Sequence, residues 1–403
     1  MRILIADDDN DIRQLLARSL QKWGHEVLAV THGVEAWEIL QKEQISFVIS
    51  DWMMPKMDGL ELCRKIRAAN FQRYIYIILL TAKDAKNELV EGMEAGADDF
   101  VVKPFNKGEL DVRIRAGERI LKLQKDLEER NKKLSEAYSV MSKDLEAAAD
   151  MQKSLLPSTA STISGIKFEW IFLPCTYVAG DIFNFFRLDE HHIGFYLLDV
   201  AGHGIPAAMQ SVTLSKLLSP LPCKSSPLKY FIPKPPHYAI SPPAKAIKEI
   251  NHRFQSEHDT MQYFTMIYGI INTPNNKIKL SQAGHPCPIY LKSGDQGLLI
   301  GSGGFPVGMF PDLEYDDYEI DFQQGDRLLL YSDGITECTN KHNQQYSINR
   351  LMNLVDECRN RPLKDLLHNL KQSLCHWRGS DEFHDDVSIL AIERNSLKSV
   401  NNK

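Results

Sequence analysis

The sequence is poor in cysteine, and its few cysteines follow no pairing pattern. Seven are scattered over 403 residues, and none forms a Cys-x-x-Cys pair. This pattern argues against a disulfide framework or a zinc site and indicates reduced thiols. Long apolar runs are also lacking, since none approaches the ~20 residues that span a bilayer. The short apolar stretch after Met1 turns acidic too soon for a secretory signal. We therefore expect a cytoplasmic protein with no membrane segment.

An excess of positive charge is missing as well. The 47 basic and 53 acidic residues give a net charge of −6, which argues against nucleic acid as a partner. Hydrophobic residues make up 43% and charged residues 25%, as in ordinary globular proteins. The chain is too long for one ordinary core, so it predicts two domains and a connector.

Short apolar runs alternate with helix-like stretches, such as Asp11–Lys22, through the N-terminal part. The runs are Arg2–Ala6, Glu26–Val30, Phe47–Ser50, Tyr74–Leu80 and Phe100–Val102. This alternation predicts an α/β domain with a parallel sheet, in which ligands bind at the carboxyl ends of the strands. Five polar residues follow those strand ends and are expected to converge there: Asp7, Asp8, Asp51, Thr81 and Lys103.

Residues 1–120 resemble the CheY-like receiver domain of two-component response regulators, through IADDD, SDWMMPKMDG, LLTA and ADDFVVKPF. The resemblance implies a doubly wound fold around a five-stranded parallel sheet. It also implies a sensor histidine kinase as partner, Asp51 as phosphoacceptor, and Lys103 and Thr81 as groups that contact the phosphoryl oxygens. One Mg²⁺ would be held by Asp7 (through water), Asp8, Asp51 and the Met53 carbonyl, and the Lys103–Pro104 bond would be cis.

Each of these residues has a simpler interpretation when it is taken alone. Asp7–Asp9 has the composition of a helix N-cap cluster before Asp11. Lys103 alone is typical of a solvated surface lysine, and Thr81 of a strand-end residue. Their joint occurrence at these offsets favours the receiver interpretation.

The segment 121–156 carries a heptad pattern and reaches Pro157 without a proline. Apolar residues fall every seven positions at Leu127, Leu134, Met141, Ala148 and Leu155. The intervening seam positions are more polar: Gln124, Asn131, Tyr138, Leu145 and Gln152. The pattern predicts a helical linker that forms a parallel coiled coil in a homodimer. The alternative is a single amphipathic helix that lies on one of the domains.

Residues 157–395 read as short strands joined by Gly, Asn and Asp turns, which predicts an antiparallel α+β domain. Expected strands are Phe168–Leu173, Gly194–Val200, Tyr263–Ile271, Lys277–Ser281, Pro288–Lys292, Tyr318–Ile320, Arg327–Tyr331 and Val387–Ile392. An aspartate lies beside a strand in VAGDIFNFF, LLDVAGHGIPAA, LLLYSDGITE and HDDVSIL: Asp181, Asp199, Asp333 and Asp385. Four carboxylates and a backbone carbonyl suit two Mg²⁺ or Mn²⁺ ions, which would activate water for attack on phosphate.

The region from about 150 to 395 resembles the PPM-type metal-dependent serine/threonine phosphatases, in particular their SpoIIE/RsbU-like branch. MQKSLLP, GHGIPAA, QAGHPCPIY, FPVGMF and QGDRLLLYSDGITE carry the likeness. It implies a β-sandwich flanked by helices and two Mn²⁺ or Mg²⁺ ions. Asp199 would bridge the ions, and Asp181 would bind through water. The second ion would lie on Asp333 and Asp385, with Asp386 as the alternative to Asp385, and the Val200 carbonyl would be the backbone ligand.

The chain departs from this branch at three places. Asn184 stands where an aspartate is common, which leaves the role of position 184 open. His203 lies four residues after Asp199, so no general-acid role is carried over, and we expect His203 and His285 to order loops. Pro220–Pro243 contains eight prolines and is expected to be a solvent loop, with a lid or docking flap as the alternative.

The sequence therefore predicts a response regulator in which phosphorylation of Asp51 controls a metal-dependent serine/threonine protein phosphatase. By resemblance, the substrate is a phosphorylated regulatory protein such as an anti-sigma factor antagonist. The alternative is a catalytically silent phosphatase-like module that sequesters a partner under receiver control. A DNA-binding output is disfavoured, because no basic helix-turn-helix follows the receiver.

Overall fold

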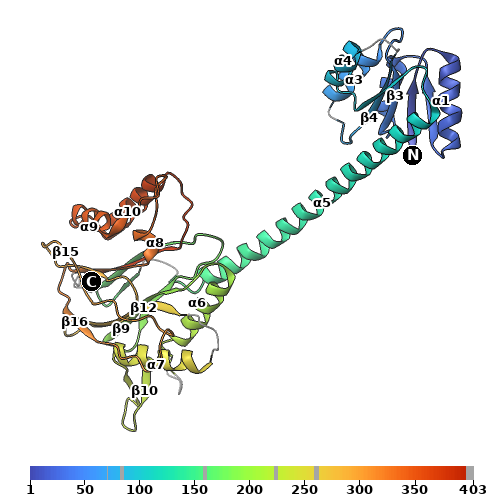
Figure 1. Cartoon of the computed structure of the whole chain (residues 1–403). Coiled ribbons are helices and arrows are strands. Elements are labelled where there is room, and N and C mark those ends of the chain that lie inside the picture. Colours follow the sequence, from blue (N-terminus) through green and yellow to red (C-terminus); the bar gives the residue numbers. More distant parts are fainter. Residues whose placement is uncertain (70, 82–85, 158–160, 222–225, 258–262, 396–403) are drawn as a thin grey trace, which may run out of the picture. The chain divides into compact units, whose positions relative to one another are not determined.

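The computed structural model describes residues 1–69, 71–81, 86–157, 161–221, 226–257 and 263–395 (Figure 1). The chain divides into two compact units, Met1–Val140 and Met141–Lys403. Within the described parts, no helix combines the length and the apolar character needed to cross a membrane.

The N-terminal unit is built around a five-stranded parallel sheet with the strand order β2-β1-β3-β4-β5. The strands are β1 (Arg2–Ala6), β2 (Glu26–Val30), β3 (Phe47–Asp51), β4 (Tyr76–Thr81) and β5 (Asp99–Val102). The helices between them are α1 (Asn10–Lys22), α2 (Gly33–Lys42), α3 (Gly59–Ala68) and α4 (Lys86–Glu94). The predicted strands and the doubly wound fold are confirmed, with boundaries that differ by one or two residues.

Successive residues of the central strands point into two separate cores, as the strand period of two requires. Ile3 and Ile5 pack on one face with α1 and with the start of the long helix α5 (Lys107–Lys153). Leu4 and Ala6 pack on the other face with α2 and α3. Both faces of the sheet are therefore buried, which leaves its carboxyl edge for ligands.

The expected long helix is a single element, α5 (Lys107–Lys153), of 47 residues. Leu127 and Leu134, two apolar heptad residues, are 53% and 69% exposed in the single chain. Gln152 differs from the heptad expectation, because its side chain is buried against the C-terminal unit of its own chain. Leu155 lies beyond the helix end and packs on that unit's core. The seam therefore stops before Gln152, and dimerisation stays a prediction.

The C-terminal unit contains two antiparallel sheets with the orders β16-β13-β12-β9-β8 and β15-β14-β17-β18-β7-β6. The first consists of β8 (Ile182–Arg187), β9 (His192–Val200), β12 (Phe264–Asn272), β13 (Lys277–Ala283) and β16 (Tyr318–Asp321). The second consists of β6 (Ser161–Ile163), β7 (Ile166–Leu173), β14 (Ile289–Leu291), β15 (Gly297–Leu299), β17 (Arg327–Tyr331) and β18 (Val387–Arg394).

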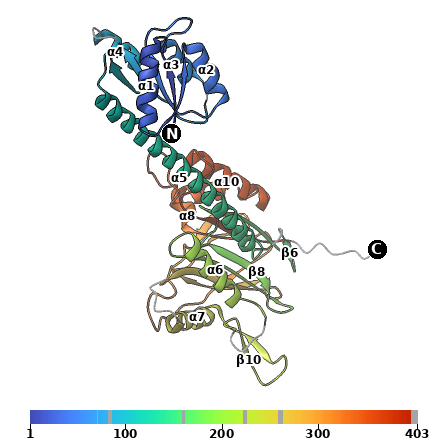
Figure 2. The same ribbon diagram turned by 90° about the vertical axis from the view of Figure 1, so that its right-hand side faces the viewer.

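The two sheets form a sandwich with helices outside it (Figure 2). Phe168 and Leu390 of one sheet share a buried core with Phe195 and Tyr268 of the other. The six-stranded sheet also packs on α9 (Ser347–Glu357) and α10 (Leu363–Arg378). The five-stranded sheet contacts α6 (Ile205–Leu217) and α7 (Pro243–Glu257). The predicted β-sandwich flanked by helices is confirmed.

Several parts of this unit differ from the sequence expectation. Strands β6, β8 and β15 were not expected, although β8 follows Asp181 directly and is rich in aromatic residues. The proline-rich segment was expected to be a loop, yet it contains a two-stranded hairpin of β10 (Lys229–Phe231) and β11 (Tyr238–Ile240). Residues 222–225 of that segment lie outside the described part of the chain.

Candidate functional site

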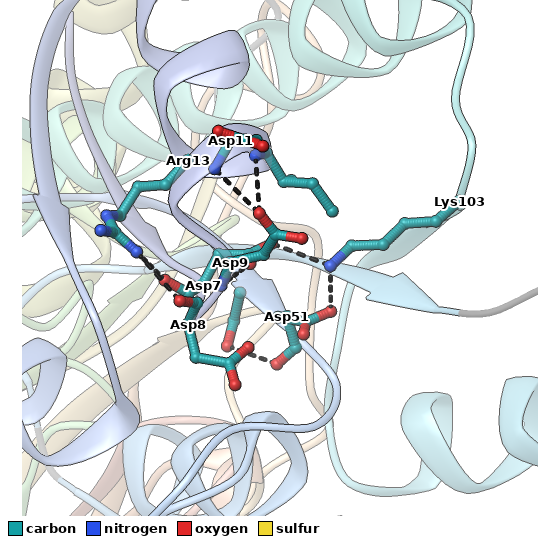
Figure 3. Close-up of polar contacts among 9 residues, drawn as sticks. Asp7, Asp8, Asp9, Asp11, Arg13, Asp51 and Lys103 are labelled. Carbon is teal, nitrogen blue, oxygen red and sulfur yellow. Dashed lines mark hydrogen bonds and ion pairs between the residues drawn. The ribbon is translucent and has the colours of Figure 1, made fainter.

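The expected carboxylates of the receiver meet at the carboxyl edge of its sheet (Figure 3). One carboxylate oxygen each from Asp7, Asp8 and Asp51 lies within 4.8 Å of the others. Asp9 does not join them: its carboxylate accepts hydrogen bonds from the backbone N–H of Asp11 and Ile12 and caps α1. The acidic run thus serves two purposes, a candidate metal site and a helix cap.

Lys103 forms ion pairs with two carboxylates of this cluster. Its Nζ lies 2.6 Å from Asp51 Oδ1 and 2.9 Å from Asp7 Oδ2. Burial disfavours the ammonium, but the contacts with the two carboxylates outweigh it and raise the pKa of Lys103. Burial is also the main reason why the pKa of Asp51 is raised, and Lys103 opposes that shift.

The remaining receiver residues lie around the same edge. Thr81 ends β4 and is buried, and its carbonyl accepts a hydrogen bond of 2.7 Å from the Lys103 N–H. The cis Lys103–Pro104 bond is confirmed. Met53 lies two residues after Asp51 with an exposed side chain, and the role of its carbonyl as a ligand stays a prediction.

The four expected aspartates of the C-terminal unit come from separate segments that the sandwich brings together. Asp181 precedes β8, Asp199 lies near the end of β9, and Asp333 begins the short helix α8 (Asp333–Thr336). Asp385 precedes β18. Gly334 permits this assembly, because a Cβ there would lie 2.0 Å from the Asp386 carbonyl oxygen. The absence of a side chain at Gly334 therefore lets α8 bring Asp333 beside Asp385.

Burial and mutual repulsion raise the pKa values of these carboxylates. Burial, followed by Asp333, Asp385 and Asp386, raises the pKa of Asp199 to about 8. The pKa of Asp333 rises to about 6, mainly through burial and then through Asp385. Burial also raises the pKa of Asp385. The cluster is therefore costly to ionise without a compensating cation.

Asp181 gives the clearest sign that a cation belongs here. Its side chain is 1% exposed, and neither carboxylate oxygen has a hydrogen-bond partner among the described residues. The Ser332 and Ser388 hydroxyls lie near enough to favour its charged form, but outside hydrogen-bonding geometry. Burial and then Asp199 raise its pKa well above the ordinary range. Buried carboxylates of this kind fit Mg²⁺ or Mn²⁺, which oxygen ligands and water coordinate.

Asp385 and Asp386, which sequence reasoning could not separate, have different surroundings. Both oxygens of the buried Asp386 carboxylate are used, by the Cys175 N–H at 2.8 Å and the Gly180 N–H at 2.7 Å. Asp385 is more exposed and accepts a hydrogen bond from the Asp386 N–H. Asp386 thus joins the segment before β18 to the connection between β7 and β8, and the choice of Asp385 as metal ligand stays a prediction.

Cys175, which sequence reasoning did not single out, lies at the same place. Its sulfur is within 4.8 Å of ligand atoms of Asp385 and Asp386. Burial and then Asp386 raise the pKa of this thiol to about 12, so it is protonated near neutral pH. No spacing pattern in the sequence could have indicated Cys175, because the two carboxylates near its sulfur, Asp385 and Asp386, lie more than 200 positions away along the chain.

The residues that departed from the family pattern also have definite surroundings. Asn184 donates from Nδ2 to the Leu155 carbonyl at 3.3 Å and accepts from the Phe185 N–H, so it supports the chain after α5. His285 is buried, with Nδ1 2.7 Å from Thr265 Oγ1, and burial lowers its pKa to about 3. His203 is exposed. The expectation that His285 orders a loop agrees with its neutral, buried state.

Each of the two units matches a known protein family. Residues 189–395 match the family model of Stage II sporulation protein E (SpoIIE), which is more than half of the chain. The chain belongs to the SpoIIE family. Residues 3–115 match the response regulator receiver domain. The SpoIIE-family phosphatase unit and the receiver are thus joined in one chain through α5.

Individual relatives match one or the other part. Response regulator MprA of Mycobacterium leprae is 45% identical over 116 residues, which cover 29% of this chain and 50% of MprA. Phosphoserine phosphatase RsbP of Bacillus subtilis is 27% identical over 256 residues, which cover 62% of this chain and 58% of RsbP. The chain thus spans about half the length of these relatives.

A solved structure supports the fold of the C-terminal unit. The SiaA-PP2C domain of Pseudomonas aeruginosa superposes with a TM-score of 0.53 at 16% identity. The match covers 64% of this chain and 98% of that domain. At this identity the likeness establishes a shared PPM-type fold.

Proposed function

We propose that this protein is a response regulator in which phosphorylation of Asp51 controls a metal-dependent serine/threonine protein phosphatase. The observation that carries the proposal is the Asp181 carboxylate, which is fully enclosed beside other carboxylates and has no hydrogen-bond partner among the described residues. Such a group is stable in a folded protein when a cation offsets its charge. The matched SpoIIE family and the relative described as a phosphoserine phosphatase support the choice of reaction.

In the phosphatase unit, Asp181, Asp199, Asp333 and Asp385 would hold two Mn²⁺ or Mg²⁺ ions, together with the Val200 carbonyl. Such ions would supply activation of water and would offset the charge of the phosphate group. Asp199 is buried near Asp333, Asp385 and Asp386, which help to raise its pKa, and it would hold the ions together with the other ligands. Asp386 holds the connection between β7 and β8 at both Cys175 and Gly180, which orients Asp181.

In the receiver, Asp51 is the nucleophile. A carboxylate oxygen attacks the phosphorus of the donor, the bond to the donor's leaving group breaks, and an acyl phosphate forms on Asp51. Lys103 stays near the added phosphate charge, because it already contacts Asp51 and the neighbouring Asp7. Asp7, Asp8 and Asp51, with the Met53 carbonyl, would hold a Mg²⁺ ion, which would offset negative charge during this transfer. A sensor histidine kinase supplies the phosphoryl group.

The substrate of the phosphatase is a protein phosphorylated on serine or threonine, such as an anti-sigma factor antagonist, as the family resemblance suggests. The working form is a homodimer. Leu127 and Leu134 support this, because a coiled coil would cover apolar side chains that the single chain leaves 53% and 69% exposed.

The test replaces Asp199 with alanine and measures Mn²⁺-dependent hydrolysis of a phosphoserine peptide. Loss of a metal ligand should lower turnover by more than about 100-fold, since even residues that merely support ligands contribute about 10- to 100-fold. The exposed Asp295→Ala variant is the matched control and should retain full activity. Wild-type turnover in Asp199→Ala would refute the mechanism. A wild type that shows calorimetric Mn²⁺ binding that Asp199→Ala lacks, yet has no turnover, would favour the silent binding module.

A further inference from the structure

The side chain of Gln152 connects the last turn of α5 to the active-site unit. It is 3% exposed, although it lies on a helix that is largely exposed to solvent. Its Nε2 donates to the Ala179 carbonyl at 2.7 Å, and its Oε1 accepts from the Ala179 N–H at 3.0 Å. A third bond, of 3.1 Å, links Nε2 to Ser211 Oγ on α6. The amide therefore holds both backbone groups of one residue, as a neighbouring strand would.

The residue that Gln152 holds lies two positions before Asp181. Between them, the Gly180 N–H donates to Asp386. The segment Ala179–Asp181 is thus fixed on one side by α5 and on the other by the carboxylate next to Asp385. Asp181 itself receives no hydrogen bond from the described residues, so its position depends on how this backbone is held.

The same contact reaches the second metal-binding segment through α6. Ser211 Oγ bonds to the Ala208 carbonyl within α6 and lies 3.4 Å from the Ala179 carbonyl. Helix α6 starts at Ile205, a few residues after Asp199 and Val200. Gln152 therefore bonds to the segment of Asp181 and also to the helix that follows Asp199.

The apolar packing at Gln152 itself is slight, whereas Leu155 and Leu156, just beyond the helix end, pack on the core of the same unit. Ala149, one turn earlier on the helix, forms a small buried cluster with Val178 and Ala208. Small side chains give little apolar area and little resistance to sliding. A hydrogen bond, in contrast, is lost beyond about 3.2–3.5 Å. A shift of α5 by one residue's rise, about 1.5 Å, would break both bonds to Ala179.

We propose that Gln152 is a positioning residue whose amide sets the place of Asp181 and thereby the affinity of the phosphatase unit for divalent cations. The proposal rests on the proposed function in one respect, the assignment of Asp181 as a metal ligand. Helix α5 is continuous from Lys107 to Lys153, so a rotation or shift of this helix acts on the metal site through Gln152. Gln152 does not touch the reacting atoms.

The test measures Mn²⁺ binding by calorimetry on the full-length protein. Gln152→Met keeps the length of the side chain and removes all three hydrogen bonds. It should weaken Mn²⁺ binding by about 10- to 100-fold, the range for groups that orient metal ligands. Met151→Gln, at the exposed neighbouring position, is the control and should bind as the wild type does. A merely structural role would lower the urea midpoint of the metal-free protein and leave the Mn²⁺ dissociation constant unchanged.

The outcomes separate this inference from the proposed function. Failure of the wild type to bind Mn²⁺ would overturn the metal-dependent function itself. Equal Mn²⁺ affinity in the wild type and in Gln152→Met would overturn the role of Gln152 alone. If Gln152→Met does not fold, Gln152→Glu replaces it. Glutamate keeps the acceptor for the Ala179 N–H but loses the donor, so weakened Mn²⁺ binding is again expected and unchanged binding refutes the inference.

Discussion

Adjacent aspartates at 385 and 386 should respond in opposite ways to the same substitution. We predict that Asp386→Ala destabilises the metal-free protein, whereas Asp385→Ala leaves its stability almost unchanged. The reason lies in their surroundings, since the Asp386 carboxylate is buried and accepts two backbone N–H groups. Asp385 is more exposed and accepts one, from its own neighbour.

The magnitude follows from these contacts. A hydrogen bond to a charged group contributes about 1.5–3 kcal/mol, so two lost bonds amount to about 3–6 kcal/mol. Removal of the Asp386 charge relieves repulsion with Asp181 and Asp199, which offsets part of the loss. We expect a net destabilisation of about 2–4 kcal/mol for Asp386→Ala. For Asp385→Ala we expect a change of less than about 1 kcal/mol, because it leaves one N–H to be satisfied by water.

The assay is urea unfolding in EDTA, followed by a far-UV signal and by tryptophan fluorescence of the C-terminal unit. A parallel calorimetric titration with Mn²⁺ gives the second half of the test, in which Asp385→Ala should lose binding. Equal destabilisation by the two substitutions, or retained Mn²⁺ binding in Asp385→Ala, would refute the assignment of Asp385 as ligand and Asp386 as loop anchor.

Three further predictions concern other parts of the chain. The lowered pKa of His285, about 3, means that the folded state binds fewer protons than the unfolded state below about pH 6.5. Relative to His285→Gln, the wild type should therefore lose about 2 kcal/mol of unfolding free energy between pH 8 and pH 5, and equal losses would contradict the neutral buried state. Lys103→Met leaves Asp7 and Asp51 without their cation and should destabilise the receiver by about 2–4 kcal/mol in EDTA, with partial recovery in Mg²⁺. Leu134→Glu should shift the protein from dimer to monomer in sedimentation velocity, whereas the similarly exposed Val140→Glu, off the heptad seam, should not.

The receiver could be predicted from sequence almost completely, for a physical reason. Its central strands β1, β3 and β4 are buried on both faces, so each is a nearly continuous apolar run, and functional residues come at or directly after the ends of these runs. Asp51 ends β3 and Thr81 ends β4, as expected. The carboxyl edge of a parallel sheet gathers such residues irrespective of side-chain detail.

The phosphatase unit was less predictable because its site depends on contacts across long sequence separations. Asp386 bonds to Cys175 and Gly180, more than 200 positions away, and nothing local distinguishes it from Asp385. Gln152 fits the heptad pattern, but the hydrogen bonds to Ala179 give it a different place. Strand β8 was missed because Gly180 and the polar Asn184 interrupt the apolar pattern around it. These contacts arise from the tertiary structure, so the hydrophobic periodicity of the sequence does not predict them.

Control of the phosphatase by the receiver through Asp51 can be measured directly. The direct measurement is the rate of Mn²⁺-dependent phosphoserine hydrolysis by the full-length wild type and by Asp51→Ala, each with and without a small-molecule phosphoryl donor. We predict that the donor changes the rate of the wild type and leaves that of Asp51→Ala unchanged. Identical rates in all four conditions would show that phosphorylation of Asp51 does not control the phosphatase.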